Sequence, residues 1–176
     1  DFKPTDFTQV NGAIKHYIVD LAINLLVPHP VDKSLDLFSG LGYFTLPIAT
    51  KVKHITGVEG SDDMVNRARK NAQLNNINNA DYFAADLFKE ISGMAWSKQK
   101  YDRILLDPAR SGAREIIEYL PEFAAHTVVY VSCNPSTLAR DTEIMVHKHG
   151  YTLLKAGVMD MFPHTAHVES IALFVK

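Results

Sequence analysis

Cysteine is nearly absent from this chain of 176 residues, in which Cys133 is the only one. A single thiol excludes an internal disulfide framework, and it excludes a zinc site or metal cluster held by several cysteines. The composition fits a reducing, cytoplasmic environment. The sequence also lacks a signal peptide and any apolar run long enough to cross a bilayer, so it predicts neither secretion nor a membrane span.

An excess of one charge is lacking too. The chain has 18 Lys and Arg against 20 Asp and Glu, a net charge of −2. There is therefore no global electrostatic case for a polyanionic partner, and a nucleic acid would have to be held by a local patch or by parts outside this sequence. The length and the 47% hydrophobic content predict one globular domain. Because the first residue is Asp1, we expect the chain to be a fragment of a longer protein.

Strand-like and helix-like segments alternate along the chain, and this predicts a doubly wound α/β sheet with parallel strands. The predicted strands are 34–38, 54–59, 80–86, 101–107, 128–131, 151–160 and 168–176. The predicted helices are 12–27, 44–51, 61–75, 113–124 and 135–150, with a weakly helical segment at 87–96. The last two strands are separated only by residues 161–167, too few for a crossover helix, so we expect them to pair antiparallel.

The lone cysteine stands at the end of a predicted strand. Residues 128–131 are apolar and largely β-branched, and Asn134 and Pro135 suit the cap and first turn of a helix. Free N–H groups at such a helix start predict a lowered pKa for Cys133 and hence a nucleophilic thiolate. The alternative is a small buried core thiol, but the carboxyl end of a strand is where open α/β sheets bind ligands.

A glycine turn follows the first predicted strand. Gly40 and Gly42 allow the backbone to approach a ligand without a clash at Cβ. A hydride-transfer fingerprint would place a third glycine where Thr45 stands, and this counts against a NAD-dependent oxidoreductase.

Three acids end successive predicted strands. Glu59 is placed to accept the hydroxyl protons of a ribose, Asp86 to reach an adenine amino group, and Asp107 to complete the rim. Each acid alone is more often a solvated loop charge or a helix cap. Together at one edge of the sheet they predict a nucleotide-type cleft.

Six motifs carry a family resemblance: FTQVN (7–11), LDLFSGLGYFTLPIA (35–49), GVEG (57–60), LLDPARSGA (105–113), YVSCNPSTLARD (130–141) and DMFPHTAHVES (160–170). The chain resembles the catalytic domain of the RNA (uracil-5-)-methyltransferase family over nearly its whole length. Two segments, DPARSGA (107–113) and MFPHTAHVES (161–170), are most similar to the bacterial branch that methylates 23S ribosomal RNA. The transfer-RNA branch is the second possibility.

This resemblance implies a Rossmann-like class I S-adenosylmethionine-dependent methyltransferase fold with an antiparallel last strand. It implies Cys133 as nucleophile and Glu169 as general base. The implied donor-binding residues are Gln9, Phe38, Gly40, Gly42, Tyr43, Glu59, Asp86 and Asp107. Relatives often have asparagine where Tyr43 and Asp86 stand, so these two contacts are expected to differ in detail. An RNA-binding TRAM domain and an iron–sulfur domain usually precede this domain in the family, and residues 1–176 contain neither.

The implied chemistry needs a thiolate, because uracil C5 is a poor nucleophile until a thiolate adds to C6. Without the family resemblance, the favoured interpretation of Glu169 would be a charged residue on the surface of a strand. His164 and His167 are alternative bases near neutral pKa. Arg110 and Arg140 suit a phosphate or carboxylate, or an ion pair within the domain.

Other classes of function stay open on the residues alone. A cytosine C5 methyltransferase uses the same thiolate logic, but its usual proline-cysteine order is absent around Cys133. A small-molecule methyltransferase would share only the donor fold and leave Cys133 dispensable. A nucleotide-binding regulatory module would bind the donor without transferring a methyl group.

Overall fold

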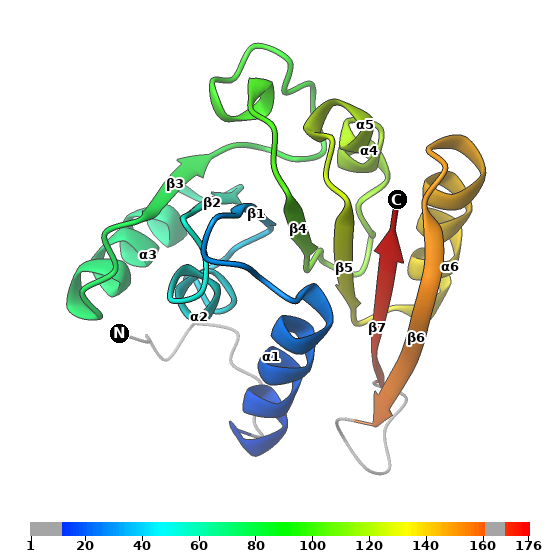
Figure 1. Cartoon of the computed structure of the whole chain (residues 1–176), viewed down its shortest axis with the longest axis horizontal. Coiled ribbons are helices and arrows are strands. Elements are labelled where there is room, and N and C mark those ends of the chain that lie inside the picture. The colour runs from blue at the N-terminus through cyan, green and yellow to red at the C-terminus, as the bar shows by residue number, and fades with distance from the viewer. Residues whose placement is uncertain (1–11, 161–167) are drawn as a thin grey trace.

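Seven strands form one mixed sheet in the order β3-β2-β1-β4-β5-β7-β6. The computed structural model describes residues 12–160 and 168–176 (Figure 1). The strands are β1 Lys33–Leu37, β2 His54–Glu59, β3 Ala80–Ala84, β4 Arg103–Leu106, β5 Thr127–Ser132, β6 Thr152–Asp160 and β7 Val168–Val175. The first five pair in parallel, and β7 runs antiparallel between β5 and β6. The predicted doubly wound sheet and the antiparallel pairing of its last strands are confirmed.

Helices cover both faces of this sheet. The apolar clusters place α1 (Gly12–Leu26), α2 (Thr45–Ala49) and α3 (Asp62–Leu74) against one face. On the other face lie α4 (Arg114–Ile117), α5 (Leu120–Phe123) and α6 (Pro135–Glu143), which continues into a π-helical turn, Ile144–Lys148. None of the helices within residues 12–160 and 168–176 has the length and apolar content that crossing a bilayer requires.

The central strands are apolar on both sides, which is why they are buried between two helix layers. In β5, Val128 and Tyr130 point into the cluster that contains Phe123 of α5. Val129 and Val131 point into the opposite cluster, beneath α1. Packing on both faces fixes the position of such a strand in the sheet. It therefore also fixes the position of the residues that directly follow the strand's carboxyl end.

A buried ion pair joins the starts of three strands. The Arg103 Nε donates to Asp32 Oδ2 at 2.5 Å, and its Nη1 donates to the Leu26 carbonyl at 2.6 Å and to Thr127 Oγ1 at 3.3 Å. Asp32 is only 7% exposed and also accepts from the His29 N–H. These contacts tie the end of α1 and the entry to β1 to the first residues of β4 and β5.

The segment 87–96 is not helical, so its predicted weak helix is wrong. It forms turns that end in a 3₁₀ helix, Trp96–Lys98. Ile91 and Trp96 anchor the segment in the core, and Ser97 Oγ donates to the carbonyls of Ile91 and Met94. A serine hydroxyl that donates to backbone carbonyls in this way competes with the backbone N–H groups that would bond those carbonyls in a regular helix.

The predicted helix 113–124 is present as two short helices, α4 and α5. Pro121 lies in the first turn of α5. Proline has no N–H, and its ring would clash with the carbonyl of Ile117 if one helix ran through. The chain therefore breaks between Ile117 and Leu120.

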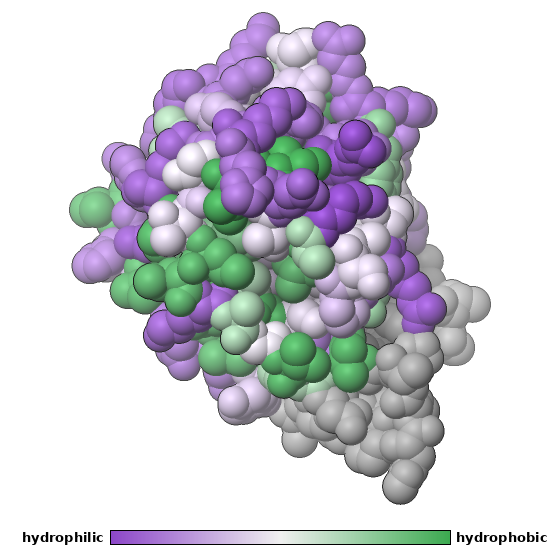
Figure 2. Space-filling view, turned by 90° about the vertical axis from the view of Figure 1, so that its right-hand side faces the viewer, coloured by the Kyte–Doolittle hydropathy of each residue, from purple (hydrophilic) through white to green (hydrophobic). Residues whose placement is uncertain are grey.

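The edge strand β6, at the right of Figure 1, is exposed along residues 152–158. Leu153, Leu154 and Val158 are 40%, 56% and 66% exposed. Figure 2 faces this side of the molecule and shows hydrophobic side chains gathered below a largely hydrophilic upper part.

Candidate active site

The glycine turn after β1 has the geometry of a backbone that faces a ligand. Phe38, Gly40 and Gly42 all have positive φ, at 65°, 54° and 86°. A Cβ on Gly42 would lie 2.8 Å from the Tyr82 hydroxyl, whereas a Cβ on Gly40 would meet nothing within 4 Å. The turn is therefore packed on its inner side at Gly42 and open at Gly40.

Glu59 stands at the end of β2 and joins this turn to the next helix. Its Oε2 accepts from the Gly40 N–H at 3.0 Å, and its Oε1 accepts from the Ser61 N–H at 3.1 Å. Ser61 is the predicted cap of α3, and its hydroxyl accepts from the Met64 N–H. The carboxylate is half-buried and holds the turn in place from the neighbouring strand.

Asp86 lies two residues beyond β3 and is exposed. It accepts from the Phe88 N–H at 3.1 Å and lies 3.1 Å from the Lys89 amine. The hydrogen bond from the Phe88 N–H lowers the pKa of this carboxyl most, and the hydrogen bond from the Lys89 amine lowers it further. Beside it, the rings of Phe38 and Phe88 are 5.7 Å apart and form an aromatic wall between the ends of β1 and β3.

Tyr43 directly follows Gly42 of the glycine turn and is partly buried. The Tyr43 ring packs edge-on against Phe44 at 5.7 Å and joins the apolar cluster beneath α1. Burial, with the charge of Asp20, raises the pKa of Tyr43 to about 12. Gln9 lies outside the described residues, as do His164 and His167.

Two carboxyls, Asp107 and Asp36, lie at or near the ends of the central strands. Burial raises the pKa of Asp107, just after β4, to about 8, and the charges of Glu169 and Asp36 add to the effect. Asp36 in β1 is fully buried, and Thr45 Oγ1 donates to its Oδ2 at 2.5 Å, while no described residue forms a hydrogen bond with its Oδ1. Burial raises the pKa of Asp36 to about 7. The sequence did not predict a role for Asp36. An acid between the apolar strand residues Leu35 and Leu37 would have indicated a buried carboxyl.

Cys133 lies where β5 ends and α6 begins, as predicted. Asn134 caps α6, since its side chain accepts from the Ser136 N–H at 3.1 Å, and Pro135 is the first helical residue. The thiol is half-buried. The strand and the cap together fix its position at the carboxyl edge of the sheet.

Antiparallel pairing brings Glu169 to this thiol. Ser132 of β5 pairs with Ser170 of β7, so Cys133 and Glu169 come next at the same end of that pair, one on each chain segment. In Figure 1, β5 points down and β7 points up, so the end of one strand meets the start of the other. Glu169 is 8% exposed, and burial raises the pKa of its carboxyl. The structure thus brings together the two residues predicted as nucleophile and base.

The pKa of Cys133 is raised, whereas the helix start had predicted that it would be lowered. Burial of the thiol is the largest cause, and the charges of Glu169 and Asp107 come next. The positive charge of Arg110 acts in the opposite direction but is outweighed. Burial and then two carboxylates from other strands therefore raise the pKa of the thiol, and neither effect is visible in the local sequence.

Asp141 lies near the end of α6. It is fully buried and accepts from the Tyr130 hydroxyl at 2.6 Å and from the Ala113 N–H at 2.8 Å. Arg140 pairs with it at 2.7 Å, which confirms the ion pair within the domain.

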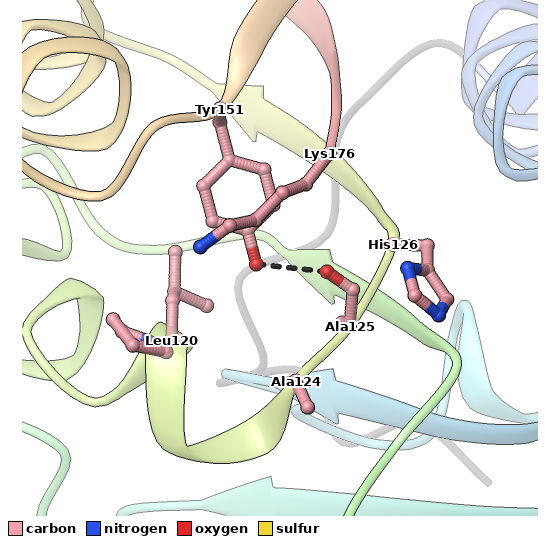
Figure 3. Close-up of a pocket in the computed structure, with 7 residues that line it drawn as sticks. Leu120, Ala124, Ala125, His126, Tyr151 and Lys176 are labelled. Atoms are coloured by element: carbon pink, nitrogen blue, oxygen red, sulfur yellow. Dashed lines mark hydrogen bonds between the residues drawn. The ribbon is translucent and has the colours of Figure 1, made fainter.

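A separate hollow of about 380 Å³ lies at the other edge of the sheet (Figure 3). Its wall includes Leu120, Ala125 and His126, which precede β5, and Lys176, which follows β7. Tyr151 donates to the Ala125 carbonyl at 2.9 Å across it, and the Lys176 amine lies 5.3 Å from the centre of the Tyr151 ring. Since Cys133 follows the opposite end of β5, this hollow is not part of the candidate active site.

Curated relatives resemble the chain over nearly its whole length. The 23S rRNA (uracil(1939)-C(5))-methyltransferase RlmD of Methylococcus capsulatus is 57% identical over 175 residues, which are 99% of this chain and 40% of that protein. The RlmD of Vesicomyosocius okutanii is 55% identical over 177 residues, which are 100% of this chain and 40% of that protein. The chain thus spans about 40% of the length of these relatives.

Solved structures share the fold. The tRNA (uracil-54, C5)-methyltransferase of Pyrococcus abyssi, in complex with S-adenosyl-L-homocysteine, superposes with a TM-score of 0.82 at 29% identity and covers 99% of this chain and 41% of that one. M. jannaschii TYW2 in complex with AdoMet, at 17% identity and a TM-score of 0.68 over 94% of this chain and 76% of that one, shows the fold alone. The sequence model of the tRNA (Uracil-5-)-methyltransferase family matches residues 2–176. The chain therefore belongs to the tRNA (uracil-5-)-methyltransferase family.

Proposed function

We propose that this chain is the catalytic part of an enzyme that methylates uracil C5 in 23S ribosomal RNA. The observation that carries the proposal is the pairing of β5 with β7, which sets Glu169 beside Cys133. Relatives that are 55–57% identical are named as 23S rRNA (uracil(1939)-C(5))-methyltransferases, and this favours ribosomal over transfer RNA. Because ribosomal RNA is the substrate, we also propose that the protein acts in the cytoplasm.

S-adenosylmethionine would bind across the carboxyl ends of β1, β2 and β3. The site fits such a group, because the glycine turn is open at Gly40 and Glu59 is fixed beside it. Asp86 and the Phe38–Phe88 wall would then face the adenine end. When bound, the donor would supply an electrophilic methyl group and would leave as the neutral thioether S-adenosylhomocysteine, which keeps the electron pair of the broken sulfur–methyl bond.

Cys133 would act on the other side of the target base. Its sulfur forms a bond to uracil C6, and the electron pair moves to C5, which can then take the methyl group. The raised pKa keeps the resting thiol uncharged at neutral pH, so the rate of this addition should rise with pH as the thiolate forms.

Glu169 would complete the reaction. Its carboxylate takes the proton from C5, the electron pair returns to the ring, and the bond between sulfur and C6 breaks. A buried carboxylate with a raised pKa accepts a proton more readily than an exposed one. Asp107 lies close enough for its charge to act on both Cys133 and Glu169, so it would face the same base.

The target uridine must leave its stack to reach Cys133, at a cost of about a few kcal/mol. A net charge of −2 gives this chain little general attraction for RNA. We propose that the regions by which the relatives exceed this chain contribute to holding the RNA, and that the chain alone methylates RNA slowly.

A 5-fluorouridine trap tests this function. The protein is incubated with S-adenosylmethionine and 23S rRNA that contains 5-fluorouridine, and a protein–RNA adduct is sought on a denaturing gel. Fluorine at C5 cannot leave as a proton, so the adduct persists. The control is Cys133→Ala, with its fold checked by circular dichroism and thermal unfolding, and Glu169→Gln should stop turnover on normal RNA.

The outcomes separate the possibilities. An adduct that needs the donor and disappears in Cys133→Ala supports the proposal, and mapping it identifies the nucleotide. An adduct with transfer RNA but not ribosomal RNA would support the activity named for the Pyrococcus abyssi enzyme instead. Donor binding without an adduct on either RNA, after an incubation long enough for slow addition to accumulate, would refute uracil C5 methylation.

A further inference from the structure

Three side chains at the two ends of α6 hold three backbone groups of the loop 107–113. The Asn134 Nδ2 donates to the Arg110 carbonyl at 3.1 Å, and the Arg140 Nη2 donates to the Ser111 carbonyl at 3.0 Å. The Asp141 Oδ2 accepts from the Ala113 N–H at 2.8 Å. We call Asn134, Arg140 and Asp141 the α6 clamp.

The clamp is rigid because its buried member is fixed from several sides. Asp141 is fully buried, and its Oδ2 also accepts from the Tyr130 hydroxyl at 2.6 Å. Its other oxygen accepts from Arg140 Nε at 2.9 Å and from Nη2 at 2.7 Å. Charge-assisted hydrogen bonds of this kind hold both orientation and distance.

Gly112 shows how closely the loop fits the clamp. Its φ is +82°, and a Cβ there would lie 2.5 Å from Arg140 Nη2 and 2.6 Å from Asp141 Oδ2. Only glycine allows the backbone to approach these two side chains so closely. The loop is therefore seated directly on α6 and not merely near it.

The charged groups around Cys133 depend on the clamp to different degrees. Asp107 continues β4, and its N–H donates to the Leu37 carbonyl at 3.3 Å, so the sheet holds it. Glu169 is held within β7. Arg110, in contrast, sits in the loop, and its own carbonyl is the group that Asn134 holds.

We propose that the α6 clamp is a positioning device that keeps Arg110 beside Cys133, against the two carboxylates that the sheet places there. This inference rests on the proposed function only in taking Cys133 as the nucleophile. Arg110 is the one cation among the described residues whose charge lowers the pKa of this thiol, while Glu169 and Asp107 raise it. Loosening the clamp should move Arg110 away and leave both carboxylates in place, so the pKa of Cys133 should rise.

The first test is the pH dependence of Cys133 alkylation by iodoacetamide, which is specific because the chain has no other thiol. Asn134→Ser keeps an oxygen that can cap α6 but loses the amide N–H that reaches the Arg110 carbonyl. Arg140→Ala removes the hold on Ser111. The matched control is Ser136→Ala, an exposed side chain on the same helix.

We expect the alkylation midpoint to move upward by about 0.5 to 1 pH unit in Asn134→Ser, Arg140→Ala and Arg110→Ala, since a nearby opposite charge is displaced. Ser136→Ala should titrate like the wild type. Adding Asn134→Ser to Arg110→Ala should give no further shift, because both changes remove the same contribution. A wild-type midpoint in the folded Asn134→Ser variant, or a full further shift in the double variant, would overturn the proposal.

The fluorouridine adduct separates this inference from the proposed function. If both hold, clamp variants form the adduct more slowly at saturating donor, their donor affinity is unchanged, and raising the pH restores part of the rate. An adduct that survives Cys133→Ala would refute the proposed nucleophile while the alkylation shifts still stand. Weaker donor binding with an unshifted alkylation profile would mean that the clamp has a structural role only.

Discussion

Asp36 is the buried charge from which the structure predicts the clearest pH dependence of stability. The replacement Asp36→Asn keeps the shape of the side chain and an oxygen that can accept from Thr45 Oγ1. It removes a fully buried negative charge, one oxygen of which has no hydrogen-bond partner within residues 12–160 and 168–176. The variant should therefore be more stable than the wild type wherever the wild-type carboxyl is ionised.

The size and sign of the effect follow from linkage. Burial raises the pKa of Asp36 from 3.8 to about 7, and one pKa unit corresponds to about 1.36 kcal/mol. A raised acid pKa means that the folded state binds the proton more tightly, so the contribution to stability is complete below about pH 4 and is lost as pH rises through 7. Between pH 5 and 8 the wild type should lose about 3 kcal/mol relative to Asp36→Asn.

Urea unfolding followed by tryptophan fluorescence between pH 5 and 9 measures this difference, because Trp96 is buried and is the only tryptophan. The control is Glu122→Gln, which removes an exposed negative charge. Its stability should run parallel to that of the wild type across this range. If Asp36→Asn also ran parallel to the wild type, the buried carboxyl would have an ordinary pKa and the reasoning would be wrong.

Other substitutions test the packing that positions the site, each by the free energy of unfolding. Gly112→Ala should cost about 2 kcal/mol or more, since its φ of +82° and the contact with Arg140 both oppose a side chain; no loss would show that the loop can shift. Arg103→Met should cost about 3 to 5 kcal/mol by leaving Asp32 buried without its partner, and adding Asp32→Asn should recover part of that loss. Ser61→Ala should cost about 1 kcal/mol through the lost cap of α3, and a neutral result would mean that solvent satisfies the Met64 N–H equally well.

The sheet was predictable because its signals are local. Apolar strand residues such as Val128 and Val129 and caps such as Ser61 and Asn134 need no distant partner to be recognised. The helix breaks were harder to foresee. Pro121 and Ser97 are local signals, but each is compatible with more than one structure, because proline is tolerated in the first turn of a helix and a serine hydroxyl can bond backbone carbonyls in helices and in turns.

The candidate site was predictable in its members but not in its electrostatics. Cys133 and Glu169 were expected from motifs, and the structure sets them side by side. The predicted direction of the Cys133 pKa was wrong because the thiol is partly buried, and Glu169 and Asp107, which come from other strands, add to the effect. The clamp was missed for the same reason, since Asp141 and Ala113 lie far apart in the chain.

The position of β7 in the sheet also determines when, during synthesis and folding, the candidate active site can assemble. On a ribosome β7 is synthesised after all the other described strands, yet it must insert between β5 and β6. Until it does, Cys133 has no carboxylate partner from β7, and β5 presents an open edge. Pairings as distant as Thr127 with Val175 form slowly, because a long loop must close first. In a nascent chain the glycine turn could thus form before Glu169 pairs with Cys133. The proposed methyl transfer would become possible only after β7 has inserted into the sheet.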